Sequence, residues 1–174
     1  MGRRIVWFDF GRCWGCGNCV ARCAELHDGK PVCWVVNADS LPVPLRCFHC
    51  SDAVCMFVCP VNAIVRRGDA VVIEHEKCRG CGFCYLACPF GAIDFDVSVR
   101  KPMKCDLCID IVEGGGAPVC VEACPTHALQ FVELDELLAK TAVRGGYAMK
   151  YMSTMDPQDL IELYYTPSPN EEVE

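Results

Sequence analysis

The sequence lacks any long apolar run, and no stretch approaches the roughly 18 apolar residues that a membrane-spanning helix requires. Its first residues, MGRRIVWFDFGRC, contain an arginine pair but only a short apolar segment, which an aspartate interrupts. Such a segment is typical of a strand, whereas a secretory signal needs a longer apolar core and a small-residue cleavage site. We therefore expect a cytoplasmic protein with no direct membrane span.

Basic clusters and nucleotide-binding fingerprints are also missing. The net charge of the 174 residues is −7, and no group of Lys and Arg resembles the footprint of a nucleic-acid-binding protein. The glycine run at 114–116 lacks the rest of a P-loop pattern, so we interpret it as a bend in the backbone. No nucleophile–base pair stands out either. The sequence thus predicts no nucleic-acid partner and no catalytic residue.

Cysteine, in contrast, is abundant, with 17 copies in 174 residues. This is close to the level that marks a cysteine-built scaffold in a short chain, and it is too high for cysteines that merely pack as small hydrophobes. Disulfides, structural zinc and iron–sulfur clusters are the three interpretations. Disulfides are rare in the cytoplasm, so zinc and iron–sulfur clusters remain the main alternatives.

Sixteen of the cysteines fall into four motifs of four cysteines each. The first and third motifs, CWGCGNCVARC and CRGCGFCYLACP, share the spacing x2-x2-x3, and the second, CFHCSDAVCMFVCP, has x2-x4-x3. The fourth, in KCDLCIDIVEGGGAPVCVEACP, is stretched to x2-x11-x3. The last three motifs end in CPVNAI, CPFGAI and CPTHAL, which indicates that one supersecondary unit has been reused. In chain order the motifs contain Cys13, Cys16, Cys19 and Cys23; Cys47, Cys50, Cys55 and Cys59; Cys78, Cys81, Cys84 and Cys88; and Cys105, Cys108, Cys120 and Cys124.

The spacing C-x2-C-x2-C-x3-C-P is that of bacterial ferredoxins that hold [4Fe–4S] clusters. Three thiolates on one tight loop can cap three corners of a cubane, and the fourth, about one helical turn further on, points at a neighbouring cluster. Zinc usually takes two cysteine pairs on one ion, and it fits the fourth motif, read alone, about as well as a cluster does. Sixteen cysteines in four ligand sets leave only Cys33 unused. This count favours four [4Fe–4S] clusters.

Short elements are expected between the motifs. Apolar segments predict strands at 5–8, 32–36, 93–95 and 129–132. Two further segments, 63–65 and 71–73, flank a turn and predict a β-hairpin, and an amphipathic helix is predicted over 134–143. Cys33 is expected to be a small buried hydrophobe in its strand. Lys104 is expected to be either a surface lysine or a cation close to cluster charge, and His49 and His127 to hydrogen-bond cluster sulfur.

Together the motifs resemble the four-cluster ferredoxin-type electron-transfer subunits of the dimethyl-sulfoxide-reductase/formate-dehydrogenase class. The resemblance covers roughly residues 3–133, and it rests on CxGCxxCxxxC at 13–23, CxHCxxxxCxxxCP at 47–60, CxGCxxCxxxCPxGA at 78–92 and KCDxC…GxxPxCVxxCPxxAL at 104–129. It implies an α+β fold of two ferredoxin-like modules with two [4Fe–4S] clusters each. The implied organisation is an intertwined domain at 1–133, with an inner module at about 42–98 and an outer module at about 3–30 and 100–133, then a C-terminal helix and partner-docking tail at 134–174.

The resemblance also implies a nested pairing of the motifs, in which each motif lends its last cysteine to the cluster of another. The two middle motifs exchange these cysteines with each other, and so do the first and the fourth. The implied ligand sets are Cys13, Cys16, Cys19 with Cys124; Cys47, Cys50, Cys55 with Cys88; Cys78, Cys81, Cys84 with Cys59; and Cys105, Cys108, Cys120 with Cys23.

By the same resemblance, the chain is expected to be a non-catalytic subunit that relays single electrons to or from a catalytic oxidoreductase subunit. A molybdenum or tungsten pterin enzyme of the formate or aldehyde oxidoreductase type is the favoured host, and hydrogenase and carbon-monoxide dehydrogenase are alternatives. A free-standing or polymerising polyferredoxin carrier is the second hypothesis, and a zinc-scaffold interaction module is the third. We expect the Tyr- and Met-rich segment 147–174 to dock on a partner or on another copy of the chain.

Overall fold

The computed structural model describes residues 2–38 and 41–140 of the chain. The chain divides into two compact units, Met1–Glu133 and Leu134–Glu174. All 17 cysteines lie in the first unit. In the second unit, residues 134–140 are helical, which agrees with the start of the predicted helix. The expected docking segment at 147–174 lies outside the described residues.

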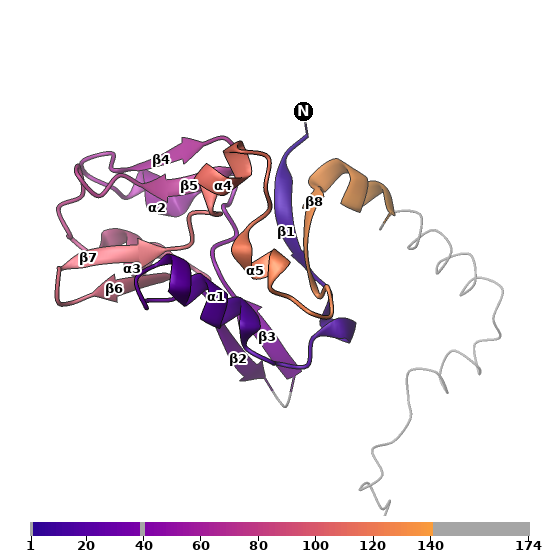
Figure 1. The fold of residues 1–174 in the computed structure, drawn as a ribbon. Coiled ribbons are helices and arrows are strands. Elements are labelled where there is room, and N and C mark those ends of the chain that lie inside the picture. The colour runs from indigo at the N-terminus through magenta and orange to yellow at the C-terminus, as the bar shows by residue number, and fades with distance from the viewer. Residues whose placement is uncertain (1, 39–40, 141–174) are drawn as a thin grey trace, which may run out of the picture. The chain divides into compact units, whose positions relative to one another are not determined.

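Strands from the two ends of the first unit pair with each other. Strand β1 (Arg4–Phe8) and strand β8 (Leu129–Glu133) form an antiparallel ribbon in which Phe8 lies opposite Leu129 (Figure 1). Val6 and Leu129 of this ribbon are buried together with Leu107. Both strands agree with the prediction from apolar segments. Strand β1 precedes the first cysteine motif and β8 follows the fourth, so their pairing brings the first and fourth motifs close together.

Two hairpins occupy the middle of the unit. Strands β4 (Ile64–Arg67) and β5 (Ala70–Ile73) form the predicted hairpin around a two-residue turn in which Gly68 has a φ of +54°, a conformation that glycine adopts without a steric penalty. Strand β6 (Ile93–Asp96), also predicted, pairs with β7 (Lys101–Lys104), which was not. Their inward side chains, such as Ile64, Val71 and Ile93, share one apolar cluster.

The fourth ribbon differs most from the prediction. Strand β2 (Trp34–Ala38) begins two residues later than expected, so Cys33 precedes the strand and is not part of it. Its partner β3 (Leu41–Leu45) has the sequence LPVPL and was not predicted, because two prolines argue against a strand. Pro42 and Pro44 occupy alternate positions in β3, so both can face the unpaired edge, where a missing N–H costs nothing.

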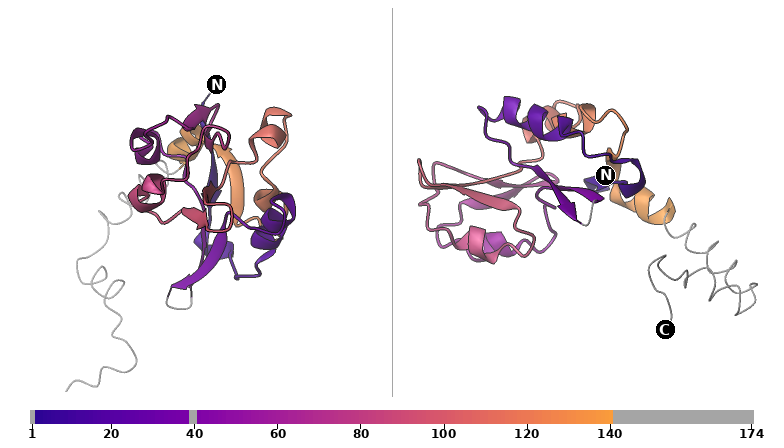
Figure 2. Two further views of the ribbon diagram at one scale, coloured as in Figure 1. Left: turned by 90° about the vertical axis from the view of Figure 1, so that its left-hand side faces the viewer. Right: turned by 90° about the horizontal axis from the view of Figure 1, so that it is seen from below.

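Short helices form two pairs on opposite sides of the hairpins. Helix α1 (Asn18–Leu26) packs against α5 (Val119–Glu122), and α2 (Val54–Phe57) packs against α3 (Phe83–Ala87) (Figure 2). A 3-10 turn, η1 (Phe10–Arg12), precedes the first motif, and α4 (Ile109–Glu113) lies inside the fourth. None of the helices in the described part of the chain has the length and apolar character needed to cross a bilayer. Short strands mixed with short helices match the α+β class that was predicted.

The loop of the third motif approaches the turn between β6 and β7 so closely that a side chain cannot be accommodated. At Gly80, where φ is +67°, a Cβ atom would lie 2.0 Å from the carbonyl oxygen of Arg100. We predict that Gly80→Ala lowers the free energy of unfolding by more than about 2 kcal/mol, because the left-handed conformation alone costs about 1–2 kcal/mol and the backbone contact adds to it. Anaerobic urea denaturation followed by circular dichroism measures the loss.

Gly91→Ala is the matched control for this variant, because Gly91 has a φ of +58° but nothing within 4 Å of its Cβ position. It should show the conformational cost alone. An equal loss of stability in both variants would mean that the close contact with Arg100 does not constrain the loop.

Candidate metal centre

The first cysteine motif meets the last cysteine of the fourth motif at one cavity. Cys13 and Cys16 come from the loop between η1 and α1, Cys19 from the first turn of α1, and Cys124 from the residues after α5. All four line the same cavity, together with Leu129 and other apolar residues of the neighbouring strands. The β1–β8 pairing explains how segments so far apart in sequence reach one place.

The second and third motifs exchange their last cysteines in the same way. The first three cysteines of the second motif share a cavity with Cys88, and those of the third motif share one with Cys59. The two cavities adjoin, because Cys55 of the second motif lies close enough to Cys84 of the third for its charge to raise the pKa of Cys84. Packing of α2 against α3 holds the two loops together.

The remaining four cysteines are the most deeply placed. Cys23, Cys108 and Cys120 are buried, and Cys105 is partly buried. Burial raises the pKa of Cys120 to about 12, and the nearby thiols of Cys108 and Cys23 raise it further. Cys23 projects from α1, so the packing of α1 against α5 delivers it to the cysteines of the fourth motif.

A repeated backbone feature explains the CP-x-x-A tails. In each tail the residue before the alanine has a positive φ, and the alanine N–H points back at the cysteine sulfur. The Ala63 N–H donates to Cys59 Sγ at 3.2 Å and the Ala92 N–H to Cys88 Sγ at 3.4 Å, and the backbone of Ala128 lowers the pKa of Cys124. All three alanines are at most 2% exposed, which leaves no room for a larger side chain.

The cysteine loops repeat a second backbone feature, which the cysteine spacing does not reveal. The residue before the second cysteine has a positive φ in every motif, at Gly15, His49, Gly80 and Leu107. This conformation is easy for glycine but strained for the other two. It turns the backbone N–H of His49, Gly80 and Leu107 toward the sulfur of the first cysteine, at 3.4 Å in each case.

These donors suit an anionic sulfur ligand, because N–H···S bonds stabilise a thiolate and tune the potential of an iron–sulfur centre. His49 adds an observation of its own. Its Nδ1 accepts the N–H of Val71 at 3.0 Å, which leaves the proton on Nε2, and burial lowers the pKa of the ring to about 2, so the ring is neutral. Nε2 is buried and has no hydrogen-bond partner in the described structure. An acceptor sulfur beside this loop would satisfy it.

The donor set as a whole fits [4Fe–4S] clusters. Each site offers four thiols and backbone N–H groups, and all 17 cysteines are free, so none is used in a disulfide. Among residues 2–38 and 41–140, no three His, Cys, Asp or Glu side chains are grouped tightly enough to hold a single metal ion. A cubane takes one thiolate at each of four separate iron corners.

Cys33 is buried, as expected, but it does more than fill space. Its thiol lies 3.6 Å from the carbonyl oxygen of Cys19 and packs beside Cys23. A hydrogen bond with Cys33 lowers the pKa of Cys23, and the same interaction together with burial raises the pKa of Cys33. Cys33 therefore lies beside one cysteine of the first motif that lines a thiol cavity and beside Cys23, which packs against the fourth motif.

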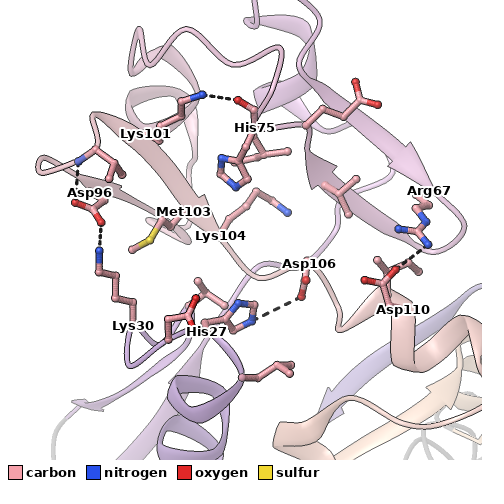
Figure 3. A pocket seen from close by; sticks show the side chains of 18 of the residues that line it. His27, Lys30, Arg67, His75, Asp96, Lys101, Met103, Lys104, Asp106 and Asp110 are labelled. Atoms are coloured by element: carbon pink, nitrogen blue, oxygen red, sulfur yellow. Dashed lines mark hydrogen bonds and ion pairs between the residues drawn. The ribbon is translucent and has the colours of Figure 1, made fainter.

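A separate cavity of about 780 Å³ lies between the end of α1, the two central hairpins and α4 (Figure 3). Charged side chains dominate its wall, and most of them are already paired with each other. These pairs include Lys30–Asp96, Arg67–Asp110 and His27–Asp106. The cavity therefore has the character of a polar groove beside the thiol sites.

Comparison with known proteins agrees with this chemistry. The family model described as a 4Fe-4S dicluster domain matches residues 38–134. The chain belongs to the 4Fe-4S dicluster domain family. It is 32% identical to the B subunit of anaerobic dimethyl sulfoxide reductase from Haemophilus influenzae over 94% of this chain and 88% of that protein. It is 34% identical to the corresponding B subunit of Escherichia coli over 77% and 75%, and 38% identical to an uncharacterized ferredoxin of Methanocaldococcus jannaschii over 78% and 76%.

Membership of this family decides between the alternatives left by the cysteine spacing. The cofactors are [4Fe–4S] clusters, and the sixteen motif cysteines suffice for four of them. The resemblance stated from the motifs alone is confirmed by the dicluster domain and by the dimethyl sulfoxide reductase relatives. The zinc interpretation of the fourth motif is not needed.

The thiols differ strongly in access, which gives a chemical test of the arrangement. Cys16 and Cys81 are exposed, whereas burial raises the pKa of Cys105 and of Cys120 to about 12 each. In protein stripped of metal by an anaerobic chelator, we predict that iodoacetamide at about pH 8 modifies the first two rapidly and the last two slowly. The reason is that the thiolate is the reactive form and burial limits both its fraction and its access.

Raising the pH should accelerate the slow pair selectively. Between about pH 8 and about pH 10 the thiolate fraction of a group with a pKa near 12 rises roughly tenfold per unit, so Cys105 and Cys120 should react faster in proportion. Peptide mapping by mass spectrometry follows each site. Equal rates at all four cysteines near pH 8 would contradict the arrangement.

Proposed function

We propose that this protein is an electron-transfer subunit that relays single electrons through four [4Fe–4S] clusters to or from the catalytic subunit of a larger oxidoreductase. The observation that carries the proposal is the convergence of sixteen cysteines into four thiol sets within one small unit. When bound, such a cluster accepts or gives up one electron. The protein contributes ligation, burial and hydrogen bonds to sulfur.

As part of this proposal, each of the three cysteine-lined cavities corresponds to one ligand set, and the thiols grouped around Cys120 form the fourth. The first set is Cys13, Cys16, Cys19 and Cys124; the second is Cys47, Cys50, Cys55 and Cys88; the third is Cys78, Cys81, Cys84 and Cys59; the fourth is Cys105, Cys108, Cys120 and Cys23. We assign the second and third sets to an inner module at about 42–98, and the first and fourth to an outer module at about 3–30 and 100–133. The shared cavities and the two helix pairs support this division.

The relative exposure of the sets supports a linear relay. Each of the first and third sets contains one exposed cysteine, Cys16 and Cys81, whereas three of the four cysteines in the fourth set are buried. Neighbouring thiols connect the first set to the fourth, through Cys19 and Cys120, and the second to the third, through Cys55 and Cys84. We propose that electrons enter at the first or the third set, cross the fourth and second sets, and leave at the other exposed set.

The similarity to the B subunits of anaerobic dimethyl sulfoxide reductases supports a catalytic oxidoreductase as the partner. Within this proposal a molybdenum or tungsten pterin enzyme is favoured over hydrogenase or carbon-monoxide dehydrogenase. Sixteen ligand thiols must stay reduced, and the cytoplasm maintains this state, so we place the protein there. Docking of residues 147–174 on the partner, or on another copy, is part of the same proposal.

A free-standing carrier is the second candidate function, favoured by the similarity to an archaeal ferredoxin. Affinity purification of the native complex under anaerobic conditions distinguishes the two. A subunit should copurify with a larger oxidoreductase polypeptide in a fixed ratio, whereas a carrier should emerge alone.

The cluster content is the first testable consequence. We predict that anaerobically purified protein is brown and contains about 16 iron and about 16 sulfide per chain, since each [4Fe–4S] cluster carries four of each. Cys33→Ala should retain the full iron content, because Cys33 is a neighbour and not a ligand in this assignment. About 8 iron per chain would reduce the protein to a two-cluster ferredoxin and reject the relay of four centres.

The exchange of last cysteines between the first and fourth motifs is tested by Cys124→Ser. We predict that this variant loses or alters the cluster held by Cys13, Cys16 and Cys19, because it removes the fourth thiolate of that set. Cys23→Ser should instead alter the cluster of the fourth motif. Iron analysis, EPR after reduction and protection of individual cysteines from alkylation identify the affected set. Exposure of Cys105, Cys108 and Cys120 in Cys124→Ser, with the first motif still protected, would reverse the assignment.

A further inference from the structure

Every cysteine motif is preceded directly by a basic residue, and the four residues have two different fates. Those before the first and third motifs are surface residues with a carboxylate partner. Arg12 Nε lies 3.3 Å from Asp9 and Lys77 Nζ lies 2.6 Å from Glu74, and both basic side chains are more than half exposed. The other two, before the second and fourth motifs, are Arg46 and Lys104.

Arg46 and Lys104 are buried, each with only 6% of its surface exposed. Lys104 Nζ donates to the carbonyl oxygens of Val71 and, at 2.7 Å, Cys105. The Arg46 guanidinium donates to the carbonyl oxygens of Val6 and, at 3.4 Å, Cys47, while its Nε has no partner in the described structure. Both side chains are thus held by carbonyl groups and form no ion pair with any carboxylate of the described residues.

Asp96 and Asp110, which line the same cavity as Lys104, are each paired with another basic side chain, so neither is an ion-pair partner of Lys104. Figure 3 shows Lys104 among these pairs. A buried charge is costly unless a charge of opposite sign compensates it. The two ion pairs are Asp96 with Lys30 and Asp110 with Arg67, and Asp106 lies 3.9 Å from His27.

The two buried cations cross between the modules in opposite directions. Lys104 precedes the fourth motif, in the outer module, and reaches Val71 in the apolar cluster of the inner module. Arg46 precedes the second motif, in the inner module, and reaches Val6 of strand β1 in the outer module. The Val71 N–H also donates to His49 Nδ1 at 3.0 Å. A chain of hydrogen bonds therefore connects the second-motif loop, through Val71 and Lys104, to Cys105.

The thiols that these cations face belong to the second and fourth ligand sets. Burial raises the pKa of Cys105, and the charges of Lys104 and Arg46 oppose this effect. Lys104 opposes it in the same way at Cys55, as does Arg46 at Cys120. Lys104 thus lies between thiols of both sets, and Arg46 beside the fourth set.

We propose that Arg46 and Lys104 form a cationic bridge between the two modules, which raises the reduction potentials of the clusters held by the second and fourth ligand sets. The inference rests on the four-cluster relay proposed above. A cluster gains one negative charge on reduction, and a nearby cation stabilises the more negative state.

The position of Lys104 between the two sets suits the step from one module to the other. When one electron crosses, the cluster on one side is oxidised and that on the other is reduced. The total charge around Lys104 is unchanged, and no proton has to move. Arg46 and Lys104 therefore act on the second and fourth centres through their positive charge.

An EPR-monitored redox titration of the full chain with all four clusters bound tests the bridge. In Lys104→Met, two of the four potentials should fall, each by at least a tenfold change in the reduction equilibrium constant, which is about 59 mV for a one-electron couple. In Arg46→Gln, one potential should fall. Lys104→Arg keeps the charge and should restore both potentials.

Lys77→Met is the matched control, because Lys77 holds the same position in the third motif but is exposed and paired. It should leave the potentials of the second and fourth sets unchanged. Unchanged potentials in Lys104→Met, a uniform fall of all four, or the same fall in Lys104→Arg would each overturn the bridge.

Iron content separates the failure of this inference from failure of the proposed function. Wild-type protein without about 16 iron rejects the four-cluster relay itself. If Lys104→Met binds less iron and Lys104→Arg restores the iron content, the positive charge is needed to hold the clusters of the second and fourth sets. This result supports the bridge. If Lys104→Arg also binds less iron, the shape of the side chain and not its charge is decisive, and the bridge is rejected.

Discussion

The convergence of thiols from distant parts of the chain is the constraint on which the rest of this structure depends. The helices that carry them have between four and nine residues, and the strands have four or five. Helices this short are not stable alone, and the apolar clusters between them are small and include cysteines as members. Thiolate ligation by iron therefore supplies much of what a larger apolar core would supply, as in other small metal-stabilised domains.

Thiolates that are brought together in the interior repel one another, and backbone N–H groups partly offset this unfavourable negative charge. A positive φ before the second cysteine of each motif, and another before the alanine of each CP-x-x-A tail, turns N–H groups toward sulfur. The positive φ recurs in each motif because each motif has thiolates that need a hydrogen-bond donor. Where glycine is absent, the left-handed conformation is adopted by His49, Leu107, Asn62 and His127 at a cost of about 1–2 kcal/mol each, which the hydrogen bond to sulfur offsets.

The repeated cysteine motifs and the apolar segments could be predicted from the sequence, whereas features that depend on contacts between distant residues could not. Cysteine spacing identified the four motifs, and apolar segments located β1, β6, β8 and the β4–β5 hairpin. Strand β3 was missed because Pro42 and Pro44 argue against a strand unless one of its edges is unpaired. Cys33 was expected inside a strand, but its role follows from its distance to Cys19 and its contact with Cys23. The burial of Arg46 had no local signal, because its partner Val6 is forty residues away in the chain.

In the proposed division into two modules, the reciprocal placement of Arg46 and Lys104 means that the modules cannot be treated as two independent ferredoxins. In that division each cationic side chain comes from one module and donates to a carbonyl group of the other, so separating the modules would leave both cations without these partners. Simple surface contact between modules would allow relative motion. Buried cations without a carboxylate partner at the junction oppose such motion, because their charge is compensated only when thiolates of both modules are close. The junction therefore fixes the distance between the second and fourth sets and places the charge of Lys104 between them. The four sets then form a single relay.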